Sequence, residues 1–283
     1  MYQDYLNNIV TYYRDSEISY SQGWDLKHSL AIHAGYFDKG NTNFRKALKR
    51  LNEVVAEHAQ ITKDDYVLDA GCGVGGSSIF LAQNYDCKVL GITISEYQVE
   101  SAKKNALNYG VENLVNFQKA DYTQTGLKSE TFDVILGFES VCCSIDKKDF
   151  IKEAYRLLKP NGRLVIVDYF QGREPSTEQE NKDYAFFLDA FACDNFDKPE
   201  LFKLKFEIAG FKEVREIDST INFMPNTLRL EILGTLSVWM NFILNLFNIK
   251  RTDARYKGGK GSILTSKFFK NGMLKYYIYS AKK

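Results

Sequence analysis

The sequence predicts a doubly wound α/β fold, built on a mostly parallel seven-stranded sheet with helical insertions that cap one edge. Two observations predict it. Short apolar segments alternate with amphipathic ones between residues 60 and 170, as expected for repeated βαβ units. The first apolar segment, 66–69, runs into a glycine-rich turn, 71–76, that opens a helix. A strand, a glycine turn and a helix form the corner where such sheets bind a phosphate or a nucleoside.

Composition narrows the classes of function. The chain has 283 residues, of which 45% are apolar and 26% are charged, and this is typical of one ordinary globular domain over 1–283. A formal net charge of +1 gives no electrostatic reason to expect a nucleic-acid partner. The 20 Phe and 18 Tyr residues suit either an aromatic core or a deep apolar pocket.

The cysteines and the N-terminal segment indicate a reducing compartment. Five cysteines show no disulfide-framework spacing, and the adjacent Cys142 and Cys143 make no useful metal chelate by themselves. We therefore expect free thiols and no metal site. The N-terminal segment lacks the apolar stretch of a signal peptide, so the expected location is the cytoplasm.

The first 60 residues are predicted to be mainly helical. Residues 1–30 carry many aromatic side chains without strong periodicity, and we expect one or two short helices that fold over the core. A compact aromatic turn is expected at 31–38. Residues 43–60 place apolar side chains at helical spacing, which predicts an amphipathic helix.

The core that follows is predicted to alternate strands and helices. One strand, 132–138, is nearly all apolar, as a strand covered on both faces should be. The five predicted strands are 66–69, 88–92, 115–119, 132–138 and 163–170. The predicted helices are 77–84, 96–109 and 147–158. The turn Lys159-Pro160-Asn161-Gly162 is expected to end the last of these helices.

Two insertions interrupt the alternation. Residues 171–198 begin polar and become an aromatic helix, and residues 223–249 form the second insertion. Within it, 232–249 has no charged residue, but its Asn, Ser and Thr side chains make it too polar for a membrane span. We expect a buried helix or a lid, and the alternative is an interfacial helix lying on a membrane. The other expected elements are a helix at 199–209, a strand at 212–220, a loop with the short basic patch 257–260, a helix at 262–270 and a strand at 273–280.

The glycine turn alone does not identify its ligand. Gly71, Gly73 and Gly76 fit the dinucleotide pattern G-x-G-x-x-G, whereas Gly71, Gly73 and Gly75 fit G-x-G-x-G. Asp69 precedes the turn at the carboxyl end of the first strand. A carboxylate there would repel a pyrophosphate, but it accepts hydrogen bonds from an ammonium, directly or through water.

Two further positions narrow the choice of ligand. After the second strand, where a nicotinamide site has an acidic residue for the ribose, this chain has Thr93. Thr93 and Gln98, about one helical turn further on, can bond the ribose hydroxyls. Asp121 follows the third strand, where it can accept a hydrogen bond from an adenine amino group, and Tyr122 lies beside it. A nucleoside that carries an ammonium and no phosphate fits these residues, and S-adenosylmethionine is such a ligand.

The same residues carry a family resemblance over roughly 30–170. Four segments are similar to the successive motifs of the class I S-adenosylmethionine-dependent methyltransferases, and they imply the Rossmann-like fold of that family. These segments are Val-Leu-Asp-Ala-Gly-Cys-Gly-Val-Gly-Gly (67–76), Gly-Ile-Thr-Ile-Ser-Glu-Tyr-Gln-Val (91–99), Phe-Asp-Val-Ile-Leu-Gly-Phe-Glu-Ser (132–140) and Leu-Lys-Pro-Asn-Gly-Arg-Leu (158–164). The second segment resembles the ribose-binding element of the branch with tocopherol, sterol and cyclopropane-fatty-acid-type methyltransferases.

The resemblance also implies a division of labour along the chain. His-Ala-Gly-Tyr-Phe-Asp (33–38) resembles the turn that covers the cofactor in this branch, so 1–40 is expected to cover it. Residues 60–170 are expected to bind the cofactor. The insertions 171–198 and 223–249 lie where the family carries acceptor specificity.

Glu139 and His33 are the candidate catalytic residues. Glu139 follows an apolar strand at the carboxyl edge of the sheet, and the resemblance places it near the methionine end of the cofactor or the acceptor. Either residue is a candidate base for a nitrogen or oxygen acceptor. An alkene acceptor would instead give a carbocation, which a carboxylate and aromatic faces stabilise.

The aromatic insertions favour an apolar acceptor such as an isoprenoid, sterol, quinone or alkaloid-like molecule, with C-methylation favoured over N- or O-methylation. Two alternatives stay open: a protein that binds S-adenosylmethionine without catalysis, and methylation of a small polar amine. A nicotinamide oxidoreductase and a nucleic-acid methyltransferase are weaker alternatives. Peripheral membrane contact through 232–249 is a further expectation.

Overall fold

The computed structural model describes residues 2–23, 26–38, 40–248 and 253–283, and it has a seven-stranded sheet in the order β3-β2-β1-β4-β5-β7-β6. The first five strands run parallel, whereas β7 is antiparallel to both β5 and β6. The strands are β1 (Tyr66–Ala70), β2 (Lys88–Thr93), β3 (Val115–Lys119), β4 (Phe132–Phe138), β5 (Leu158–Gln171), β6 (Lys212–Asp218) and β7 (Leu274–Lys282). The predicted doubly wound, mostly parallel sheet is confirmed.

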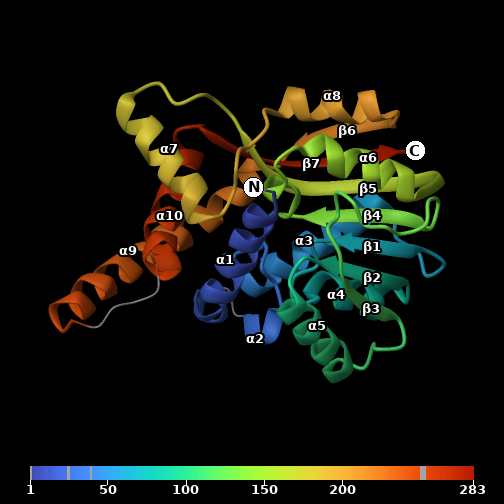
Figure 1. Cartoon of the computed structure of the whole chain (residues 1–283), viewed down its shortest axis with the longest axis horizontal. Helices are drawn as coiled ribbons and strands as arrows, with labels where there is room; N and C mark the ends of the chain where they lie inside the picture. The colour runs from blue at the N-terminus through green and yellow to red at the C-terminus, as the bar shows by residue number, and fades with distance from the viewer. Residues whose placement is uncertain (1, 24–25, 39, 249–252) are drawn as a thin grey trace.

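Helices cover both faces of this sheet (Figure 1). Alternate strand residues point to opposite faces, so Val67 packs with α3, α4 and α5, while its neighbour Leu68 packs with α6 and α8. The helices of these two layers are α3 (Phe44–Ala59), α4 (Gly76–Tyr85), α5 (Glu96–Asn108), α6 (Lys147–Leu157) and α8 (Pro199–Ala209). Both cores are built from buried apolar side chains, and they fix the carboxyl ends of the strands relative to one another.

Side-chain caps set the helix starts in this core. The Asn43 side chain accepts a hydrogen bond from the Lys46 amide at the start of α3, and Ser95 does the same for the Gln98 amide at the start of α5. Asp146 caps α6 through the Lys148 amide. These caps satisfy amides that have no partner within the helix, so each helix begins at a defined residue.

The remaining helices form a cap beyond one end of the sheet. Figure 1 shows α7, α9 and α10 grouped there, with α1 beside them. These elements are α1 (Tyr2–Gly23), α2 (Leu26–Ser29), the 3-10 turn η1 (Val141–Cys143), α7 (Glu178–Ala190), α9 (Thr220–Leu246) and α10 (Asp253–Lys270). The cap is therefore built mainly from the N-terminal helices, from the two insertions and from α10, which precedes the last strand.

Three local expectations are wrong. The segment 159–162 is not a simple turn, because β5 already pairs with β4 at Leu158 and then bulges, with Asn161 in the left-handed region at φ 65°. Residues 2–23 form one long helix where short helices are expected. The basic patch 257–260 lies in α10, which begins at Asp253 rather than near residue 262, and Lys257 pairs there with Asp189.

The second insertion is expected to be a buried helix or a lid. The buried helix is wrong, whereas α9 side chains such as Leu233 and Met240 line a cavity, as those of a lid would. Among the described residues, α9 is the one helix that is long and apolar enough to cross a membrane, and only 22% of its most apolar window is buried. Its second half projects from the body (Figure 1) and exposes large apolar side chains. Residue 249, the last of the predicted uncharged segment, lies outside the described residues.

Candidate active site

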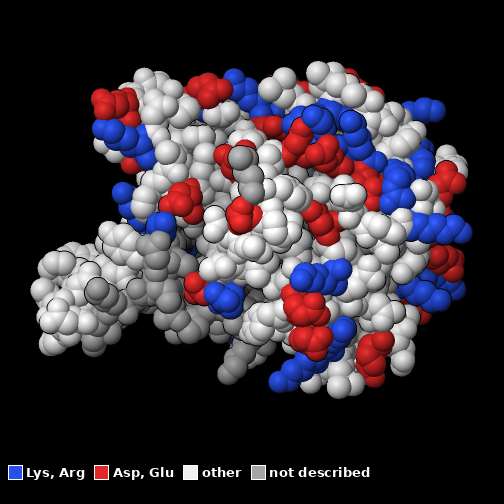
Figure 2. Space-filling view, in the orientation of Figure 1, with Lys and Arg blue, Asp and Glu red and all other residues white. Residues whose placement is uncertain are grey.

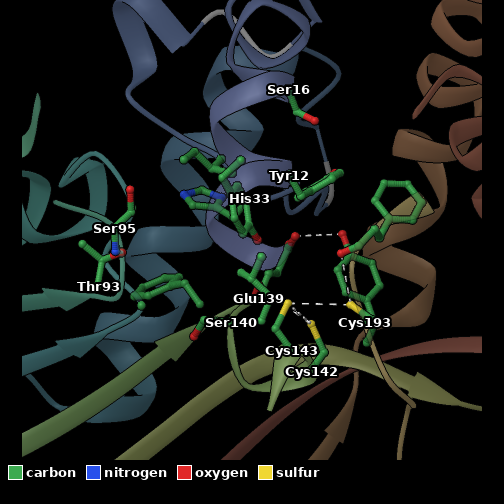
Figure 3. A pocket seen from close by; sticks show the side chains of 18 of the residues that line it. Tyr12, Ser16, His33, Thr93, Ser95, Glu139, Ser140, Cys142, Cys143 and Cys193 are labelled. Atoms are coloured by element: carbon green, nitrogen blue, oxygen red, sulfur yellow. Dashed lines mark hydrogen bonds between the residues drawn. The ribbon is translucent and has the colours of Figure 1, made fainter. Parts of the chain in front are cut away.

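The carboxyl ends of β1, β2 and β4 open into a cavity of about 470 Å³, a size typical of small-molecule sites. One half is lined by the glycine turn and by polar side chains that follow the strands. The other half is lined by α1, α7, α9 and α10. Figure 3 shows Glu139 between Thr93 on one side and three cysteine side chains on the other.

The glycine turn lets the backbone form the floor of this cavity. Gly71, Gly73 and Gly75 all lie in the left-handed region, at φ 91°, 53° and 87°, which glycine adopts without steric cost. A Cβ on Gly71 would lie 2.4 Å from the Cβ of Ser140. Gly71 and Gly73 line the cavity. Gly75 does not line it: this residue caps α4 and lies against the ring of Phe117. Two of the three predicted glycines therefore line the cavity.

Asp69 lies at the bottom of the cavity. Its side chain is 1% exposed and accepts a 2.6 Å hydrogen bond from the Ser78 hydroxyl. Burial raises the pKa of this carboxyl to about 6, while the Ser78 hydroxyl and amide act in the opposite direction. An ammonium in the cavity would stabilise the charged form and lower this pKa again.

Thr93 and Gln98 are brought together as predicted. The Thr93 hydroxyl donates a 2.6 Å hydrogen bond to Oε1 of Gln98, and both residues line the cavity. The Ser95 amide donates to Thr93 Oγ1, and Ser95 caps the helix that carries Gln98. The pair is therefore held rigidly at the end of β2, where hydroxyl groups of a ligand would find both a donor and an acceptor.

Asp121 and Tyr122 also line the cavity, just after β3, which pairs with β2 beside Thr93. The Asp121 carboxylate accepts hydrogen bonds from Thr123 and from the hydroxyl of Tyr2, at 2.6 Å in the latter case. Tyr2 is the first residue of α1, so the N-terminal helix is fastened over this part of the cavity, as expected for a covering segment. The Tyr122 hydroxyl donates to the carbonyl of Ser140. Its hydrogen is therefore already used, and Tyr122 forms part of the cavity wall.

Glu139 is held at the junction of the two halves of the cavity. Its carboxylate accepts hydrogen bonds from the Tyr276 hydroxyl at 2.6 Å, the Tyr169 hydroxyl at 2.8 Å and the Ala34 amide at 2.8 Å. Burial raises the pKa of Glu139, although these three donors partly oppose the rise. Its backbone is in the left-handed region at φ 45°, a strained conformation for a non-glycine residue at a functional site.

His33 is also in the cavity wall, but its geometry argues against a role as base. Nδ1 bonds the carbonyl of Ala34 at 2.8 Å, and Nε2 lies 3.3 Å from the side-chain amide of Asn52. With Nδ1 donating and Nε2 accepting, the ring is neutral and neither nitrogen has a free lone pair for a substrate proton. Burial lowers the pKa of His33 to about 4, which fits a neutral structural residue.

Sequence reasoning missed the tyrosines that position Glu139 and those that line the far half. Tyr169 and Tyr276 come from β5 and β7, and a strand pattern gives no sign that their hydroxyls meet a carboxylate. The far half is lined mainly by aromatic and aliphatic side chains. These include Tyr5, Tyr12, Tyr13, Phe187, Phe191, Phe196, Leu230, Leu233 and Met240. The abundance of Tyr and Phe was the only signal for them.

The charges of the cavity fit the predicted cofactor. Among the described residues that line it there are three carboxylates, Asp69, Asp121 and Glu139, and no Lys or Arg side chain. A pyrophosphate would meet no cation here. S-adenosylmethionine carries an ammonium and a positively charged sulfur, so a cavity lined by carboxylates fits it.

Comparison with known proteins agrees with this chemistry. Residues 68–166 match a family described as a methyltransferase domain. The chain is 26% identical over 274 residues to a probable tocopherol O-methyltransferase of Oryza sativa subsp. japonica, covering 92% of this chain and 74% of that protein. It is 30% identical over 167 residues to a sterol 24-C-methyltransferase of Saccharomyces cerevisiae.

The chain belongs to the class I S-adenosylmethionine-dependent methyltransferases. The two curated relatives are named for small-molecule acceptors, a tocopherol and a sterol. A cyclopropane synthase from Mycobacterium tuberculosis has the same fold, with a TM-score of 0.83, 16% identity and 98% of both chains covered. The match to the yeast methyltransferase covers 59% of this chain and only 42% of that protein.

Proposed function

We propose that this chain transfers the methyl group of S-adenosylmethionine to an apolar small molecule, of the isoprenoid, sterol, quinone or alkaloid-like class. The observation that carries the proposal is the division of one cavity into two chemically different halves. The half beside β1 and β2 offers carboxylates, hydroxyls and glycine backbone. The half under the cap offers aromatic and aliphatic walls. The first suits the cofactor and the second an apolar acceptor.

When bound, S-adenosylmethionine supplies a methyl group already activated by a positively charged sulfur. The chain's own contribution is to align the two molecules and to exclude water. In the proposed arrangement Asp69 accepts from the ammonium, Thr93 and Gln98 bind the ribose, and Asp121 binds the adenine amino group. The helix α1 closes the cavity over Asp121 through Tyr2.

Glu139 is the proposed catalytic group, and its surroundings favour C-methylation over N- or O-methylation. A carbon acceptor with a double bond gains positive charge when it receives a methyl group, and a carboxylate beside it stabilises that charge. The raised pKa of Glu139 then makes it a better proton acceptor for the step that restores the double bond. Tyr169 and Tyr276 keep the carboxylate aimed into the cavity.

The experiment that identifies the acceptor is a screen of cell-extract lipids with the purified chain and methyl-labelled S-adenosylmethionine, followed by mass spectrometry of the labelled product. We expect label in an organic-soluble product. If only water-soluble amines are labelled, the apolar acceptor is wrong and the polar-amine alternative holds. Cofactor binding without release of S-adenosylhomocysteine in any extract would favour a non-catalytic binding protein.

The proposed role of Asp69 predicts how cofactor affinity depends on pH. The ammonium needs the ionised carboxylate, and Asp69 protonates below pH about 6. We therefore expect calorimetry to give affinity about tenfold weaker at pH 5 than at pH 7.5. Asp69→Asn should lower the affinity at pH 7.5 and flatten the dependence between these pH values. An equally steep dependence in Asp69→Asn would assign the titration to another group.

We further propose that the projecting half of α9 lies in a membrane interface, with the body of the protein in the cytoplasm. Residues 232–248 have no charged side chain, and Figure 2 shows the projecting lobe as uncharged surface on the face in view. Trp239, Phe242 and Leu246 are each more than half exposed. An exposed group of large apolar side chains that includes a Trp suits the boundary between lipid headgroups and acyl chains.

Vesicle co-sedimentation tests this contact. The triple variant Trp239→Ser/Phe242→Ser/Leu246→Ser should bind phosphatidylcholine vesicles roughly 100-fold more weakly, because each side chain loses on the order of 1 kcal/mol of burial. The matched control is Leu107→Ser/Leu201→Ser/Ile208→Ser, three similarly exposed residues on other helices, which should bind like the parent chain. Equal vesicle binding by parent and variant, with a concentration-dependent dimer lost in the variant, would assign this surface to a second copy of the chain.

A further inference from the structure

Three cysteine sulfurs meet on the wall of the far half of the cavity. Cys142 and Cys143 lie in η1, three and four residues after Glu139, and Cys193 lies in the loop after α7. The Sγ atoms of Cys142 and Cys143 are 3.9 Å apart, those of Cys143 and Cys193 are 3.7 Å apart, and all three lie within 4.8 Å of one another. Figure 3 shows the three sulfur atoms pointing toward a common point.

Two buried contacts hold together the segments that carry these cysteines. The hydroxyl of Tyr5 in α1 donates to the carbonyl of Cys143 at 2.9 Å and to that of Ala192 at 3.3 Å. The ammonium of Lys147, only 2% exposed, donates to the backbone and side-chain oxygens of Asn195. Contacts from α1, α6 and the loop after α7 therefore fix the positions of the three cysteines together.

The spacing of the sulfurs fits a metal ion better than a disulfide. Four sulfurs around Zn²⁺ at about 2.3 Å have edges of about 3.8 Å, which two of the sulfur pairs already match. A disulfide has a bond of about 2.05 Å, so Cys143 and Cys193 would have to move together by more than 1.5 Å. Cys142 and Cys143 are adjacent in sequence, and a bond between them would strain the peptide that joins them.

The charges around the cluster fit a doubly charged ion. Three thiolates and one divalent cation carry a net charge of −1, and the buried Lys147 ammonium interacts electrostatically with Cys143. The nearby Asp168 accepts hydrogen bonds from the amides of Cys142 and Tyr169 through different oxygens, and its carboxylate also interacts with the Cys142 side chain. Soft or borderline metal ions bind thiolates in preference to oxygen ligands, whereas hard ions such as Mg²⁺ do not.

We propose that Cys142, Cys143 and Cys193 form a trithiolate site for one zinc ion. Binding replaces three S–H bonds with three zinc–sulfur bonds, releases three protons and changes no oxidation state. Because all three cysteines line the cavity, the fourth position of a tetrahedral ion faces the cavity and is left to a molecule there. The site stands apart from the residues proposed to bind the cofactor, and it does not depend on the proposed acceptor.

Metal titration of the reduced, metal-free chain tests the site. Zn²⁺ alone, titrated against a chromogenic chelator, should bind at one ion per chain, and Cd²⁺ should give the ultraviolet charge-transfer band of a metal thiolate. Cys193→Ser should weaken Zn²⁺ binding roughly 100-fold or more, because it removes one of three ligands. Tyr5→Phe keeps every sulfur but loses the bridge between the two segments, and it should weaken binding about tenfold.

Cys87→Ser is the matched control, since Cys87 is a buried free cysteine outside the cavity. It should bind Zn²⁺ like the parent chain, and circular dichroism melts should show that every variant is folded. The proposal is overturned if the parent chain binds less than one ion, or if Cys193→Ser and Cys87→Ser bind Zn²⁺ equally. A Cys143–Cys193 disulfide that forms in air, in a chain that never binds Zn²⁺ when reduced, would also overturn it.

Discussion

Replacing Gly73 with aspartate is expected to weaken S-adenosylmethionine binding by about two orders of magnitude or more while the domain stays folded. The backbone of Gly73 is part of the cavity wall, so a side chain there occupies ligand space and adds a negative charge to the cavity. The fold should survive, because a Cβ at this position meets only the terminal carbon of Ile32, at 2.9 Å. Calorimetry gives the affinity, and a thermal melt gives the stability.

Gly110→Asp is the control for this prediction. Gly110 also lies in the left-handed region, at φ 68°, and a Cβ there has nothing within 4 Å. Both variants should lose about 1 kcal/mol of stability for the backbone conformation, which Asp tolerates better than most residues. Only Gly73→Asp should lose the cofactor. Equal cofactor affinity in the two variants would refute the assignment of the glycine turn to the cofactor.

The sheet could be predicted from the sequence because its strands are encoded locally. Segments such as 132–138 are short, apolar and bounded by turns, so pattern and length decide them without tertiary information. The bulge at 159–162 could not be predicted, because Pro160, Asn161 and Gly162 form an ordinary turn signal. What makes them part of β5 is the pairing of Leu158 with Phe132, a contact between segments 26 residues apart.

The cofactor side of the site was predictable for the same reason. Asp69, Thr93 and Asp121 each lie at or just beyond the carboxyl end of a strand, and the carboxyl ends of parallel strands share one edge of the sheet. The structure brings all three into one cavity. The role of His33 could not be judged from the sequence, because the partner of its second nitrogen, Asn52, comes from α3 and no pattern connects the two residues.

The cap resisted prediction because its contacts are not local. The expected burial of the second insertion followed from its apolar composition, but composition does not say whether another element covers a helix. The three cysteines give a second example. Cys142 and Cys143 alone gave no reason to expect a metal, and the third sulfur arrives from a loop 50 residues away.

Replacing Glu139 with glutamine is expected to lower turnover about 100- to 1,000-fold, while the affinity for S-adenosylmethionine changes less than about threefold. Glutamine has nearly the same shape, but it carries no charge to stabilise a positively charged acceptor and takes up no proton at neutral pH. Its amide oxygen can still accept from the Ala34 amide or Tyr276, so the loss of one hydrogen bond should cost only about 1 kcal/mol of stability. Single-turnover kinetics with the identified acceptor measures the rate.

Tyr169→Phe separates the charge of Glu139 from its position. The variant removes the hydroxyl that donates to Oε2 at 2.8 Å and leaves the carboxylate in place, so we expect a smaller loss of rate, about tenfold. Because that donor opposes the effect of burial, its removal should raise the pKa of Glu139 further and move the acidic limb of the pH–rate profile to higher pH. Glu139→Gln should abolish that limb. An unchanged rate in Glu139→Gln would reduce Glu139 to a residue that ties Ala34, Tyr169 and Tyr276 together, and the proton would then have to leave the acceptor by another route.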